Sequence, residues 1–128
     1  MAAQTHYTKD HEWITHEPAG PATVGLTKFA ARQLGDVVFV ELPDVGRVFN
    51  AGDAVGTVES VKAVSEYYAP VGGTVTEVNS ELSDEPELIN EDAESAGWLY
   101  RLKPDSSASY DGLLDRKGYD KWAAEGAD

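Results

Sequence analysis

The sequence contains no cysteine, and its only methionine is Met1. A chain without cysteine has no disulfide, no thiolate metal site and no thiol nucleophile among its own side chains. It also lacks any run that approaches the ~20 apolar residues of a membrane-spanning helix. Any sulfur chemistry in its function must therefore come from a group that another molecule supplies.

Basic residues are scarce. The 10 Lys and Arg residues stand against 23 Asp and Glu residues, which gives a formal net charge of -13. Nucleic acid and anionic membrane surfaces would repel such a chain, so we expect neither as a partner and expect basic grooves on other proteins instead. The first residues show no basic region followed by an apolar segment, which favours a cytoplasmic protein.

The composition is otherwise that of an ordinary globular domain. The 128 residues are 41% hydrophobic and 26% charged, which is enough for one domain with a single core. Within it we expect a hairpin core at about residues 22–103 and a helical extension at about residues 105–126. No broad apolar stripe asks for a second copy, so a monomer is expected.

Short strands dominate the sequence pattern. Residues 7–14 are expected to form one short edge strand, residues 22–26 another, and residues 37–42 a buried strand rich in β-branched side chains. Thr27 is a credible N-cap for one short helix, which Gly35 ends. Further along, turn residues recur at the spacing of a β-sandwich or barrel. The chain is therefore predicted to be mostly β.

One lysine occupies a distinctive position. Lys62 lies between two strand-like segments, residues 54–58 and residues 64–68. At the tip of a tight hairpin, a lysine projects its long stem into solvent from a rigid base, so that a modifying enzyme can reach the amine. This geometry suits a tethered arm, although spacing alone describes many ordinary surface lysines equally well.

Resemblance to a known family decides between these two interpretations. The run Val58-Glu-Ser-Val-Lys-Ala-Val-Ser-Glu66 resembles the lipoylation segment of glycine cleavage system H proteins. The resemblance continues in the same order through most of the chain, at residues 7–13, 34–43, 69–75, 77–79, 86–90 and 97–98. It implies a mostly β, lipoyl-domain-like barrel-sandwich hybrid with a short internal helix and C-terminal helices.

The same resemblance implies a cofactor. Lipoate would be attached to Lys62 as an amide by a lipoate ligase or a lipoyl/octanoyl transferase. The residues that such an enzyme could read are the neighbours of the lysine, namely Glu59, Ser60, Val61 and Ala63. Their alternative role is simply to form the turn.

The family also implies partners and a role. The protein would carry the aminomethyl group of glycine from glycine decarboxylase (P protein) to aminomethyltransferase (T protein), and reducing equivalents to dihydrolipoyl dehydrogenase (L protein). It would be a carrier without a catalytic residue. Glu12 and His11 lie in the N-terminal family motif and are candidates for a cleft that holds the cationic aminomethyl arm. Gln33 stands where some family members carry a histidine.

Other lysine-bearing carriers and other classes of protein would show different sequence features. Biotin acceptor turns typically place methionine beside the lysine, whereas Val61 and Ala63 stand there. Lipoyl domains of 2-oxoacid dehydrogenases belong to chains with Ala/Pro-rich linkers. An H-like protein that relays lipoyl groups to other complexes stays open, as does an unmodified adaptor. An enzyme would need a nucleophile with its base or a phosphate-binding loop, and neither motif is visible.

The spacing of the histidines argues against a metal site. His6, His11 and His16 repeat every five residues. Along a strand this odd spacing turns neighbouring members to opposite faces, and on a helix it does not stack them. No metal is therefore expected.

Overall fold

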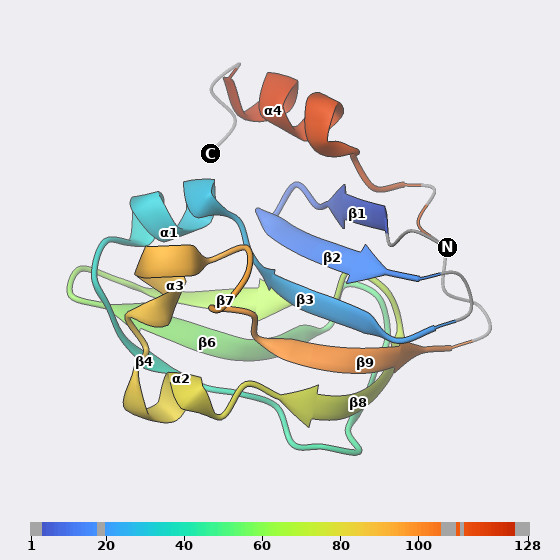
Figure 1. The fold of residues 1–128 in the computed structure, drawn as a ribbon, viewed down its shortest axis with the longest axis horizontal. Coiled ribbons are helices and arrows are strands. Elements are labelled where there is room, and N and C mark those ends of the chain that lie inside the picture. Colours follow the sequence, from blue (N-terminus) through green and yellow to red (C-terminus); the bar gives the residue numbers. More distant parts are fainter. Residues whose placement is uncertain (1–3, 18–19, 106–109, 111, 125–128) are drawn as a thin grey trace.

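The computed structural model describes residues 4–17, 20–105, 110 and 112–124. Two antiparallel sheets form the body of the protein (Figure 1), with strand orders β1-β2-β3-β9-β8-β5 and β4-β6-β7. The strands of the larger sheet are β1 (Gln4–Tyr7), β2 (Glu12–His16), β3 (Ala22–Leu26), β9 (Tyr100–Pro104), β8 (Gly73–Val78) and β5 (Val48–Phe49). Those of the smaller sheet are β4 (Val37–Val40), β6 (Ala54–Ser60) and β7 (Val64–Tyr68).

Short helices cover the ends of the sheets. They are α1 (Lys28–Leu34), α2 (Glu81–Asp84), α3 (Leu88–Asp92) and α4 (Arg116–Ala124). Helices α1 and α3 pack together at one end of the molecule, while α4 lies over β1 (Figure 1). In the described part of the chain, none of the helices has the length and apolar character needed to cross a membrane.

The main core is built from both sheets. Val24 and Val75 of the larger sheet are fully buried in one cluster with Val58 and Tyr67 of the smaller sheet. The buried residues of the two sheets thus share one core, as in packed β-sheets generally. The predicted mostly β, barrel-sandwich fold is therefore confirmed, and its strands form two antiparallel sheets.

The prediction of a single strand at residues 7–14 was wrong. Residues 7–14 do not form one strand, because the chain turns back between β1 and β2. The Thr8 hydroxyl group accepts hydrogen bonds from the backbone N–H groups of Asp10 and Glu12, at 3.1 and 3.2 Å. Within this turn His11 has a positive φ of 64°. The local hydrogen bonds of a threonine thus override the extended pattern.

The expected short helix is present with both of its caps. The Thr27 hydroxyl group accepts a hydrogen bond from the Ala30 N–H group at 3.2 Å. Gly35 ends α1 with a φ of 77° and donates its N–H group to the Ala31 carbonyl. This left-handed conformation is the one that glycine adopts at little cost.

Strand β4 departs from the prediction of a buried strand. Val37 and Val40 are buried as expected, but Val38 and Phe39 are both exposed. The register against β6 shifts between Val37 and Phe39, so that two consecutive residues face outward. Such a β-bulge turns side chains away from strict alternation, and a single sequence gives no sign of it.

Helices α2 and α3 were not predicted. Each is a single turn or little more, too short to show a helical period. Each nevertheless inserts one fully buried residue into the core, Leu82 from α2 and Ile89 from α3. Strand β9 begins three residues later than expected, at Tyr100, and a Cβ atom added at Gly97 would lie 2.7 Å from the Leu88 carbonyl oxygen of α3.

Candidate functional site

Lys62 lies exposed at the tip of the β6–β7 hairpin, the loop that reaches furthest past α1 and α3 (Figure 1). Ser60 closes the turn around it. The Ser60 N–H group donates to the Ala63 carbonyl at 2.8 Å, and its hydroxyl oxygen accepts hydrogen bonds from the N–H groups of Ala63 and Lys62 at 3.1 and 3.3 Å. The lysine therefore projects from a turn that is closed by its own hydrogen bonds.

The neighbours proposed from the sequence lie in the same turn. Val61 is 69% exposed and Ala63 is also exposed, while Glu59 and Ser60 are half-buried at the end of β6. All four thus lie in the hairpin turn around Lys62. Ser60 has a structural part in the turn, whereas the apolar surface of Val61 is left open to contact.

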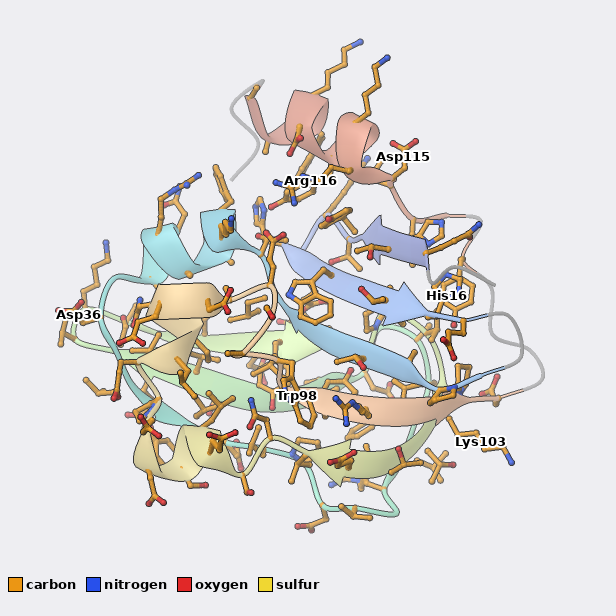
Figure 2. All side chains as sticks on the ribbon, viewed as in Figure 1. His16, Asp36, Trp98, Lys103, Asp115 and Arg116 are labelled. Atoms are coloured by element: carbon orange, nitrogen blue, oxygen red, sulfur yellow. The ribbon has the colours of Figure 1, made fainter. Side chains whose placement is uncertain are left out.

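The hairpin tip also rests on the turn that joins α1 to β4. The Val61 N–H group donates to the Asp36 carbonyl at 3.0 Å. A Cβ atom added at Gly35 would lie 3.2 Å from Lys62 Cε, so the lysine stem passes directly over this glycine. Asp36 marks this end of the molecule in Figure 2. Sequence reasoning did not place this turn beside the lysine, because the contact joins distant segments.

A cavity opens beside the hairpin. Its volume is about 380 Å³, and its walls come from the β1–β2 turn, α1, and strands β6 and β7. The lining residues that bear on function are Asp10, His11, Phe29, Gln33, Ala63 and Glu66. Ala63, the residue after the lysine, lines this cavity, whereas the Lys62 stem lies over Gly35 next to it.

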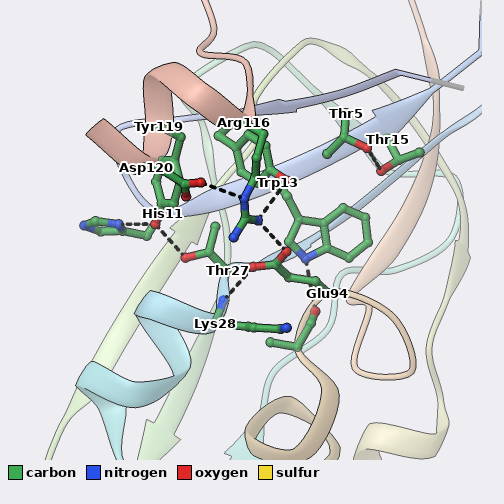
Figure 3. A network of polar contacts seen from close by, with 12 residues as sticks. Thr5, His11, Trp13, Thr15, Thr27, Lys28, Glu94, Arg116, Tyr119 and Asp120 are labelled. Atoms are coloured by element: carbon green, nitrogen blue, oxygen red, sulfur yellow. Dashed lines mark hydrogen bonds and ion pairs between the residues drawn. The ribbon is translucent and has the colours of Figure 1, made fainter. Parts of the chain in front are cut away.

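The His11 ring forms part of the cavity wall and is held in place by α4. It stacks on Phe29 with ring centroids 4.5 Å apart. Its Nδ1 atom lies 2.7 Å from the Tyr119 hydroxyl oxygen, which in turn lies 2.8 Å from the Thr27 hydroxyl oxygen (Figure 3). The C-terminal helix thus fixes both the histidine ring and the cap of α1.

Glu12 does not line the cavity. Its side chain is 1% exposed, with Oε2 accepting a hydrogen bond from the Tyr68 N–H group at 2.7 Å and Oε1 one from the Thr8 hydroxyl group at 3.3 Å. Burial raises the pKa of this carboxyl group to about 8. The carboxyl groups that do line the cavity are those of Asp10 and Glu66. Sequence reasoning missed their role, although both lie within the segments that carry the family resemblance.

The buried carboxyl group predicts a pH dependence of stability. Between its unfolded pKa of 4.5 and its folded pKa of about 8, the folded protein keeps a proton that the unfolded chain releases. Rising pH therefore lowers the free energy of unfolding, by up to about 1.4 kcal/mol per pH unit from this group. Glu12→Gln removes this ionisation and keeps a hydrogen-bond acceptor for Tyr68.

We expect the Gln variant to be more stable than the wild type at pH 8, with the difference shrinking as the pH falls to 5. Urea unfolding of both proteins at a series of pH values measures it, and the difference between them cancels the contribution of the other carboxyl groups. A difference that stays constant over this range would contradict the assignment.

The three histidines lie in two separate places. His6 Nδ1 lies 3.0 Å from His16 Nε2, and the His16 ring stacks on Tyr110 with centroids 3.6 Å apart. His11 lies instead in the cavity wall. The β1–β2 hairpin brings the outer two together, so the three do not form one cluster.

Comparison with known proteins gives consistent matches along the whole chain. A family model described as glycine cleavage H-protein matches residues 5–126. Glycine cleavage system H protein 2 of Pseudomonas putida is 53% identical over 119 residues, which cover 93% of each chain. The glycine cleavage system H protein of Pseudoalteromonas atlantica is 50% identical over 120 residues, covering 94% of this chain and 93% of the relative.

A solved structure agrees with these matches. The crystal structure of a glycine cleavage system H protein from Mycobacterium marinum superposes with a TM-score of 0.87 at 40% sequence identity. The superposition covers 97% of this chain and 99% of the other. The similarity therefore extends to the arrangement of both sheets and of the helices at their ends.

Proposed function

Because the chain belongs to the glycine cleavage H-protein family, the lipoyl carriers of the glycine cleavage system, we propose that Lys62 carries the lipoyl group in amide linkage. The observation that carries this proposal is the exposed position of Lys62 at the tip of a closed hairpin. The amine is open to a modifying enzyme, and the turn beneath it is fixed.

The surroundings of Lys62 fit a lipoyl group. Amide formation removes the ammonium charge, which leaves a neutral, mostly apolar arm. The adjacent cavity offers apolar surface from Phe29, Leu34 and Val64 together with a few polar groups. When bound, the lipoyl group supplies a disulfide that accepts the aminomethyl group of glycine together with reducing equivalents. The cysteine-free chain does not supply such sulfur itself.

The proposed partners follow from this role. The carrier would move between glycine decarboxylase (P protein), aminomethyltransferase (T protein) and dihydrolipoyl dehydrogenase (L protein), after modification by a lipoate ligase or a lipoyl/octanoyl transferase. Its contribution is to present the arm, while the catalytic residues belong to the partners. The net charge of -13 favours docking to basic surfaces around their active sites.

The chain's own residues would protect the loaded arm in the cavity. An aminomethyl amine is cationic at neutral pH, and the carboxylates of Asp10 and Glu66 in the wall favour that charge. The His11 ring, with Phe29 stacked on it, limits the access of water. Glu12 supports the wall through its hydrogen bond to the Tyr68 N–H group at the end of β7.

Three further proposals concern the domain division, the location and the oligomeric state of the chain. We propose a single carrier domain that works as a cytoplasmic monomer, with the hairpin core at about residues 22–103 and the helical extension at about residues 105–126. Analytical ultracentrifugation of the modified protein tests the oligomeric state.

Intact mass spectrometry tests the function directly. The purified protein is incubated with lipoate, ATP and a lipoate ligase, and in parallel with biotin, ATP and a biotin ligase. We expect one lipoyl adduct, located on Lys62 by peptide mapping, and no biotinyl adduct. An unmodified mass after incubation with an active lipoate ligase, or an adduct on a different lysine, would rule out the proposal.

A further inference from the structure

Hydrogen bonds link the β6–β7 hairpin, which carries Lys62, to α3, a helix further along the sequence. The Ser60 bonds close the turn around Lys62 only locally. A hairpin tip that is closed in this way can still tilt as a unit relative to the sheet. Strand β6 is paired with β4 as far as Ser60 and Val37, and beyond this pairing the tip is joined to the body by the bond from the Val61 N–H group to the Asp36 carbonyl, 3.0 Å long.

The segment that supplies this carbonyl is itself held by one side chain. Asn90 Nδ2 donates to the Gly35 carbonyl at 2.7 Å, and Asn90 Oδ1 accepts from the Val37 N–H group at 2.8 Å. One amide group thus binds the backbone on both sides of Asp36. A side-chain amide offers a donor and an acceptor side by side, whereas an ionised carboxylate offers acceptors alone.

The two bonds of the Asn90 side chain, called the clamp below, start from a helix that is anchored in the core. Ile89, next to Asn90 in α3, is fully buried in the core. Residues 35–37 form the sharp connection between α1 and β4, where Gly35 has a φ of 77°. The Gly35 carbonyl accepts a hydrogen bond from the Asn90 side chain, and the Val37 N–H group donates one to it. The Lys62 stem lies directly over Gly35.

We propose that Asn90 is a positioning residue for modification of Lys62. It holds residues 35–37 against the hairpin, and through the Val61 N–H group it sets the pose in which the lysine amine meets the lipoylating enzyme. The inference rests on the function proposed above. In the reaction concerned, the neutral Lys62 amine attacks the acyl carbon of lipoyl adenylate, which forms the amide and releases AMP and a proton.

The test compares three variants of the full chain. Asn90→Ala removes both bonds of the clamp. Asn90→Asp keeps an acceptor for the Val37 N–H group but loses the donor to the Gly35 carbonyl. Ile89→Val is the matched control, because it trims a buried methylene from the neighbouring residue of α3 and leaves the clamp in place.

Two measurements are made at a temperature at which urea unfolding shows all the variants to be folded. Steady-state lipoylation with lipoyl adenylate and a lipoate ligase gives kcat and KM for the carrier. Hydrogen exchange gives the protection of the Val61 amide. For Asn90→Ala we expect kcat/KM to fall about tenfold and Val61 exchange to accelerate about tenfold, consistent with two lost hydrogen bonds. Asn90→Asp should fall between this variant and the wild type.

The outcomes separate this inference from the proposed function. Wild-type kcat/KM in Asn90→Ala would overturn it, as would an equal loss in Ile89→Val, since the effect would then follow stability and not the clamp. Unchanged Val61 exchange in Asn90→Ala would overturn it too. Failure of the wild type to be modified at Lys62 would instead overturn the proposed function.

Discussion

Lys62→Arg is expected to remove lipoylation and to reduce reconstituted glycine decarboxylation to the level found without the carrier. An arginine keeps a long cationic side chain, but its guanidinium stays protonated and does not form the amide. The side chain is exposed at the hairpin tip, so the fold should be unaffected. Intact mass measures the first effect, and release of CO₂ from glycine with P, T and L proteins measures the second.

Lys9→Arg is the matched control for this experiment. Lys9 is also exposed and also lies in a turn, the one between β1 and β2. We expect this variant to be lipoylated and active like the wild type. If Lys62→Arg were as active as Lys9→Arg, or if Lys9→Arg also lost its adduct, Lys62 would not be the attachment site.

Gly56→Ala is expected to have the largest effect on stability. A Cβ atom at this position in β6 would overlap the Glu41 carbonyl oxygen and lie 2.7 Å from the Tyr67 hydroxyl oxygen. These two atoms cannot easily separate, because the Tyr67 hydroxyl group donates to the Glu41 carbonyl at 2.6 Å. The smaller sheet would have to shift, so we expect the free energy of unfolding to fall by about 3 kcal/mol.

Urea unfolding measures this loss, and Gly112→Ala serves as its control. A Cβ atom at Gly112 meets no atom within 4 Å, so its substitution should change stability by only about 0.5 kcal/mol. Equal stabilities of the two variants would show that the backbone of β6 can move away from Glu41 more easily than the structure indicates.

Features that depend on local chemistry could be predicted from the sequence. Thr27 and Gly35 cap α1 through bonds to residues three or four positions away, and the turn at Lys62 is closed by Ser60, two residues before it. Such interactions are encoded within a few residues, so a short window of sequence contains both partners.

Features that depend on distant segments could not be predicted. Asn90 binds Gly35 and Val37 across more than fifty residues, and the bulge in β4 depends on its pairing with β6. Asp10 and Glu66 come from separate hairpins to line one cavity. Their roles arise only when the sheets pack, and nothing within their own neighbourhoods specifies them.

Neither the residue spacing nor the geometry of the hairpin identifies the cofactor. Spacing described Lys62 equally well as an ordinary surface lysine, and the structure shows only that its amine is exposed. The proposal of a lipoyl group at Lys62 rests on family membership, and the exposed hairpin tip is compatible with it. Val61 and Ala63, which stand where biotin acceptors typically carry methionine, point in the same direction.

The hydrogen bonds at two strand ends have a consequence for solubility. At the outer side of β1, Tyr7 and Leu114 exchange backbone bonds of 2.7 and 2.8 Å, and at the outer side of β7 the Tyr68 N–H group is taken by Glu12. An amide that is already bonded cannot recruit a strand from another molecule. Crowded copies of this carrier thus have fewer places at which to join edge to edge and start an aggregate.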